Sequence, residues 1–119
     1  ALPPNDVWAV GGPDAYHFDG SNWAAAGISS TAPLRTLDMY SDTEGWAASS
    51  DTLYHYNGLT WQAESIPNGI TNITDIDIVS PTDVWAVESG SPSTILHYDD
   101  LGWQAVATVT TSLVQIDMI

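Results

Sequence analysis

Three histidines and three aspartates recur along this 119-residue chain, and they are the side chains best suited to hold a metal ion. His17, His55 and His97 each stand inside an aromatic segment that is closed by a turn. If these segments are the third strands of radial sheets, each histidine lies two strand spacings, about 10 Å, from the innermost strand, and the side chains diverge. We therefore expect a structural role, with each imidazole hydrogen-bonded within or between sheets.

The aspartates Asp38, Asp77 and Asp117 are 39 and 40 residues apart, each within a strand-like run. If these runs line a common axis, their carboxylates form a ring that could hold a cation such as calcium. Alternatively, each carboxylate accepts hydrogen bonds from backbone amides of the following turn, which would favour its ionised form. We favour the second interpretation and therefore expect no cofactor. If the carboxylates do form a ring, calcium is the metal that we expect it to hold.

The tryptophans fall into two sets of three. Trp8, Trp46 and Trp85 stand among apolar neighbours and are predicted to belong to the core. Trp23, Trp61 and Trp103 each follow a histidine by six residues and lie beside polar hairpin turns. Exposed rings of this kind can form stacking platforms for sugars or can simply cover the edge of a sheet. The second set is therefore the predicted ligand-binding set.

Catalytic residues should break a repeat, because a catalytic constellation is asymmetric whereas scaffold residues recur. The chain has no cysteine and a single basic residue, Arg35, so thiol and lysine nucleophiles are excluded. The ionisable residues outside the repeat form no recognisable constellation, and we predict no catalytic residues. A glycosidase-like pair of acids stays open as a third interpretation of function, since acidic residues are plentiful.

The charge balance limits the partners. Fifteen acidic residues face one basic residue, for a net charge of −14. Nucleic acid and anionic membrane surfaces are therefore disfavoured as partners, and no segment approaches the length of a transmembrane helix. Neutral ligands, cations or salty surroundings fit better.

The elements that position these residues form a threefold repeat. Its clearest mark is a tryptophan strand, at residues 6–10, 44–48 and 83–87, whose two faces are both apolar. A histidine strand, an Asp-Gly or Asn-Gly hairpin, a Trp-opened strand and an aspartate strand follow in each copy. Four short strands and a period near 40 residues predict an all-β fold of three four-stranded antiparallel β-propeller blades, without helices. The chain is then a single three-repeat unit, 1–119, with repeats at about 1–40, 41–79 and 80–119.

The repeated Asp-Val-Trp-Ala-Val, the histidine-aromatic turn and the Trp that follows resemble the blades of bacterial secreted β-propellers. This resemblance implies that the aspartate strand is innermost, that the Trp-opened strand is outermost, and that the protein is extracellular, although the first residues show no signal peptide. The hairpin followed by Trp is more loosely similar to small lectins that build a propeller from several chains. The expected function is a non-enzymatic, lectin-like module that binds carbohydrate; the alternative is a self-assembling scaffold, natural or engineered, without a specific ligand.

Three blades do not close a propeller, which typically has at least four. The repeat begins on the second strand of a blade, at residues 6–10, and ends on an innermost strand, at residues 113–119. In a head-to-tail pair, residues 113–119 of one chain would complete the blade begun by residues 6–10 of the other. We therefore expect the main partner to be a second copy, in a homodimer that forms one six-bladed ring.

The acidic composition leads to a first testable prediction. Self-repulsion should lower the melting temperature at low ionic strength, and added sodium chloride should raise it, because the Debye length falls from about 30 Å at 0.01 M to about 3 Å at 1 M. Calorimetry over this range tests the effect. Millimolar calcium is the comparison: a rise far beyond that produced by matched sodium chloride would support the ring of Asp38, Asp77 and Asp117, and an equal rise would favour backbone hydrogen bonding.

Overall fold

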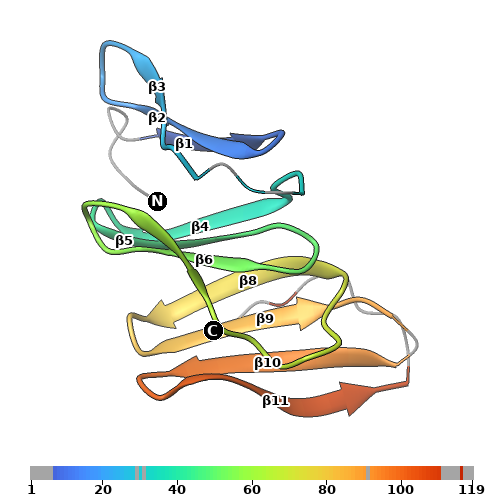
Figure 1. The fold of residues 1–119 in the computed structure, drawn as a ribbon. Coiled ribbons are helices and arrows are strands. Elements are labelled where there is room, and N and C mark those ends of the chain that lie inside the picture. The colour runs from blue at the N-terminus through green and yellow to red at the C-terminus, as the bar shows by residue number, and fades with distance from the viewer. Residues whose placement is uncertain (1–6, 29, 31, 91, 111–115, 117–119) are drawn as a thin grey trace.

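The structure is a computed structural model that describes residues 7–28, 30, 32–90, 92–110 and 116. Within these residues the protein is all-β, with eleven strands in three antiparallel sheets and no helix, which confirms the predicted fold class. Accordingly, the described part of the chain has no helix able to span a membrane. The sheets follow one another along a body of 46 × 28 × 23 Å (Figure 1).

Each sheet is a meander of consecutive strands joined by short turns. The first contains β1 (Val7–Gly11), β2 (Asp14–Phe18) and β3 (Trp23–Ala25). The second contains β4 (Thr36–Ser41), β5 (Glu44–Ala48), β6 (Leu53–Tyr56) and β7 (Trp61–Glu64). The third contains β8 (Ile73–Ser80), β9 (Asp83–Glu88), β10 (Ser93–Asp99) and β11 (Gly102–Val109).

The order of strands within the complete sheets matches the expected blade. The aspartate strands β4 and β8 form one edge of the second and third sheets, and the Trp-opened strands β7 and β11 form the other edge. The histidine strands β6 and β10 are third from the aspartate edge. Successive sheets meet near these edges, since β4 contacts both β1 and β8.

The hairpins owe their shape to an acidic or amide side chain followed by glycine. The Oδ1 atom of Asp19 accepts the backbone N–H groups of Ser21 and Asn22, and that of Asn57 accepts those of Leu59 and Thr60. Gly20 and Gly58 follow with φ of 102° and 97°, a conformation that side chains with a Cβ rarely adopt. These local bonds place the next strand, which starts with Trp23 or Trp61, beside the histidine strand.

The hydrophobic core lies between the second and third sheets. Trp46, Leu53, Ile73 and Leu96 are completely buried there. Both apolar faces of the tryptophan strand are buried in β5, as a blade between two others requires, but not in β1 or β9. Val7 of β1 is 42% exposed and Trp85 of β9 is half-buried, because each belongs to an end sheet of which only one side meets a described neighbour.

The predicted innermost strand at residues 113–119 lies outside the described residues except for Ile116. The backbone N–H of Ile116 donates to Asp75 Oδ2 on β8 at 2.9 Å. One sheet earlier, the N–H of Ile78 on β8 donates to Asp38 Oδ2 on β4 at 3.3 Å. The same kind of contact is therefore repeated one sheet further along the chain.

Leucine truncation tests where the core lies. Leu53→Ala removes a completely buried side chain and should lower the free energy of unfolding by about 2–5 kcal/mol. Leu101→Ala, at a side chain that is 85% exposed, should change it by no more than about 0.5 kcal/mol. Urea unfolding followed by circular dichroism measures both, and equal losses would contradict the described core.

Candidate functional site

The interfaces between sheets are built from a recurring group of four aromatic rings. At the first interface, Trp8 stacks on His17 of its own sheet, with ring centroids 4.4 Å apart. From the second sheet, Tyr56 and Trp61 bring their rings to 5.4 and 5.6 Å from Trp8. Tyr56 and Trp61 are themselves stacked at 5.0 Å. Two pairs of rings, one from each sheet, therefore form this interface.

The second interface repeats the group. Trp46 lies 4.6 Å from His55 in its own sheet and 4.9 and 5.2 Å from Tyr98 and Trp103 of the third sheet, measured between ring centroids. Burial raises the pKa of Tyr98, and the nearby carboxylates, led by that of Glu64, raise it further. Trp46 is completely buried and Trp103 is only 6% exposed, so this interface is closed.

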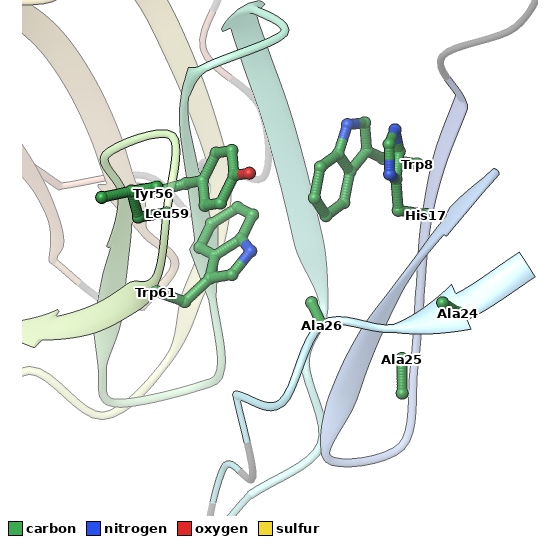
Figure 2. Close-up of a pocket in the computed structure, with 8 residues that line it drawn as sticks. All are labelled: Trp8, His17, Ala24, Ala25, Ala26, Tyr56, Leu59 and Trp61. Atoms are coloured by element: carbon green, nitrogen blue, oxygen red, sulfur yellow. The ribbon is translucent and has the colours of Figure 1, made fainter. Parts of the chain in front are cut away.

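The first interface contains a pocket of about 180 Å³. Figure 2 shows the rings of Tyr56 and Trp61 on one side and those of Trp8 and His17 on the other, with the alanines of the first sheet nearby. The lining residues are Trp8, His17, Ala24, Ala25, Ala26, Tyr56, Leu59 and Trp61. The rings of the two pairs contact each other, so the free space lies beside them, next to the alanines, and has room for one small group.

The strand register shows one difference between this interface and the second. Trp8 is opposite His17 and His17 is opposite Ala24, so these three side chains share one face of the first sheet. In the second sheet the residue opposite His55 is Gln62 in place of an alanine. Ala24 and Gln62 are both exposed, and Trp8 stays half-buried where Trp46 is fully buried.

The exposed surface of the pocket is more polar than apolar. The indole Nε1 atoms of Trp8 and Trp61 are buried and have no hydrogen-bond partner among the described residues. The same is true of Trp46 and Trp103 at the closed interface, so these donors result from the aromatic packing and do not distinguish the pocket. The pocket therefore combines aromatic rings for stacking with exposed polar surface for hydrogen bonds.

The structure separates the three tryptophans that were predicted to bind ligand. Trp61 lines the pocket, and Trp103 is buried in the closed interface. Trp23 is 54% exposed at the end of the stack, with its ring 5.4 Å from Phe18. Trp8, predicted to belong to the core, is the pocket residue that the sequence did not indicate. The signal that could have found it is the run of small residues after Trp23, where the other copies carry glutamine.

The histidines occupy equivalent positions on the faces of their sheets. The Nε2 atom of His97 lies 2.8 Å from Asp83 Oδ1, and that of His55 is hydrogen-bonded to Glu44. Both bonds are within one sheet, as expected for structural histidines. Trp85 Nε1 also donates to Asp83 Oδ1, at 2.9 Å, so one carboxylate orients both rings of the third sheet.

Asp38 and Asp77 lie on the edge strands β4 and β8, but the structure does not bring them together as a metal site. Among the described residues there is no group of three acidic or histidine side chains able to hold a metal ion, and Asp117 lies outside those residues. Asp38 accepts a backbone amide of the neighbouring sheet, that of Ile78, and not one from the following turn as we expected. Burial raises the pKa of Asp38 by more than this hydrogen bond lowers it, and the nearby charges of Asp77 and Asp75 raise it further. The expected preference for the ionised form is therefore wrong at Asp38.

The raised pKa of Asp38 predicts a pH-dependent effect of Asp38→Asn. The folded protein binds the Asp38 proton more tightly than the unfolded chain does, so the stability that Asp38 contributes falls as the pH rises from its ordinary value of 3.8 through the raised value. Asparagine keeps an acceptor for the Ile78 amide without the charge. We expect the variant to be more stable than the wild type at pH 7 and to lose this advantage in acid.

Urea unfolding at a series of pH values measures the difference between the two proteins. Asp42→Asn, which removes one charge from an exposed turn residue, is the control, and its effect at pH 7 should be smaller. A destabilised Asp38→Asn protein at neutral pH would contradict the argument and would indicate that the carboxylate is needed as an anion.

No protein-family model, curated protein or solved structure matches this chain. The likeness to secreted propellers therefore rests on the repeated motifs alone. The fold is that of three successive antiparallel meanders, and the site is the aromatic pocket between the first two.

Proposed function

We propose that the protein is a non-enzymatic propeller module that binds a small neutral ligand with a flat apolar face, such as a sugar ring, in the pocket between the first and second sheets. The observation that carries this proposal is the pair of aromatic walls formed by Trp8 with His17 and by Tyr56 with Trp61. Aromatic rings offer a large, rigid contact area to the C–H face of a sugar at little cost in side-chain entropy. The proposed extracellular location follows from the resemblance.

The size of the pocket limits the ligand. A volume of about 180 Å³ is below the roughly 300–1,000 Å³ of sites for drug-sized ligands, so we infer a single ring or the end of a longer glycan. Binding at one such site is expected to be weak, because a pocket of this size can bury only a small part of a ligand.

The charge of the protein argues for a neutral ligand. The only cationic side chain apart from histidine, Arg35, is held by Asn72 Oδ1 at 2.5 Å and by the carbonyl of Ile73 at 3.3 Å. An anionic ligand would meet a surface of strong negative charge without a positive group to pair with. Nucleic acids and acidic sugars are therefore poor candidates.

The pocket also supports a binding role in preference to catalysis. None of the eight described lining residues is a carboxylate, whereas glycoside hydrolysis normally uses two acids flanking the bond that breaks. The ring of His17, which also lines the pocket, packs on that of Trp8. This argues against the glycosidase-like alternative.

Filling the pocket tests the proposal. Ala24 lines the pocket and lies opposite His17 on the same face of the first sheet. Ala24→Leu should therefore fill the pocket and weaken binding at least about tenfold. A glycan array identifies the sugar that binds best, and titration of that sugar by intrinsic tryptophan fluorescence measures the affinity. Ala107→Leu, an exposed position on β11 in the third sheet, is the matched control and should bind like the wild type.

Two outcomes would contradict the proposal. One is the absence of binding to any neutral glycan on the array, which would leave the scaffold alternative. The other is equal affinity in Ala24→Leu and the wild type, which would place the ligand elsewhere. Tight binding to DNA at physiological salt would overturn the argument from charge.

A further inference from the structure

The two ends of the stack each carry one half of the aromatic interface that joins its sheets. At both internal interfaces, a Trp–His pair of one sheet faces a Tyr–Trp pair of the next. The third sheet carries a further Trp–His pair, Trp85 and His97, and the first sheet carries the remaining aromatic pair, Phe18 and Trp23. No aromatic ring from another sheet contacts either end pair within the described residues.

Both end pairs already have the geometry of the internal pairs. The ring centroids of Trp85 and His97 are 4.2 Å apart, against 4.4 and 4.6 Å in the two internal Trp–His pairs. Those of Phe18 and Trp23 are 5.4 Å apart, against 5.0 and 5.5 Å in the internal Tyr–Trp pairs. Neither pair needs to rearrange before it docks, which lowers the entropic cost of association.

We propose that the Phe18–Trp23 face of one chain docks on the Trp85–His97 face of a second copy, and that two such contacts close a dimer of six blades. The internal interfaces identify the docking partner, because each Trp–His face in them packs against an aromatic pair from another sheet of this same chain. The exposure of Trp23, at 54%, is the main apolar area that the contact would remove from water. This inference does not depend on ligand binding in the pocket.

The inner edge of the stack continues the same progression. Asp38 accepts the amide of Ile78 across the second interface, and Asp75 accepts the amide of Ile116 beyond it. Ile116 therefore contacts the inner edge of the third sheet, as Ile78 contacts that of the second. At the other end of the stack, β1 has no strand on its inner edge among the described residues, so its backbone groups there are available for pairing.

The number of blades selects two chains. Closed propellers usually have four to eight blades, so two copies of the three described sheets fall within the range, whereas one copy falls below it and three copies exceed it. The contact joins two different faces, so two copies close it through a twofold axis along the ring, and otherwise it forms a larger ring or an open filament. Closure removes both free faces at once and is favoured over a filament.

Light scattering on the full chain at 0.15 M salt tests the proposal directly. The expected mass is twice the 12.7 kDa of one chain, and dilution should lower the melting temperature because dissociation exposes both faces. A folded monomer at tens of micromolar, or a trimer or filament, would overturn the proposal.

Two single variants test which faces meet. Trp23→Ala and Trp85→Ala should each raise the dimer dissociation constant by about tenfold or more, because buried tryptophans commonly dominate interfaces. Leu101→Ala, at a side chain that is 85% exposed in a turn, is the control and should leave the dissociation constant unchanged. Circular dichroism confirms that each variant is folded before its mass is measured.

The comparison between the variants separates this contact from a symmetric one. If Trp23→Ala dissociates the dimer and folded Trp85→Ala does not, two first sheets face each other and the proposal is wrong. Trp61→Ala serves as an internal reference, because the equivalent ring lies within the chain and its loss should lower the free energy of unfolding of the chain itself. Equal losses of folding stability in Trp23→Ala and Trp61→Ala at dilutions where the chain is monomeric would also overturn it.

Discussion

The packing of a Trp–His pair against an aromatic pair of the next sheet is the interaction on which the rest of this structure depends. The chain has no disulfide and, with one arginine, almost no capacity for salt bridges, so burial of aromatic and aliphatic side chains must hold the sheets together. Within a sheet, hydrogen bonds between strands are sufficient. Between sheets, Trp46 shows what is required, since its ring contacts one residue of its own sheet and two of the next.

The candidate site lies at one of the two places where this interaction is repeated. Both internal interfaces have the same four rings, yet one is sealed and the other contains a pocket. One difference in sequence between them is opposite the histidine, where Gln62 of the second sheet corresponds to Ala24 of the first.

The acidic residues lower the stability of this packing. Burial raises the pKa of Asp38 although a backbone amide donates to it, so the inner edge of the stack carries charge at a cost in stability. Opposing this cost, the completely buried side chains of the second and third sheets form a continuous core. The first sheet shares less of that core, which explains why its interface has the free space.

The sequence by itself determined the strands, their order in each sheet and the absence of helices in the described chain, because those features follow from local turn chemistry and the spacing of aromatic residues. It also predicted hydrogen-bonded histidines, but their partners Glu44 and Asp83, 11 and 14 residues away, were identified by the structure. The tertiary structure alone decided which tryptophan faces a pocket. Trp23, Trp61 and Trp103 are equivalent in the repeat but differ in their neighbours, and the environment of a side chain depends on which sheet packs against it.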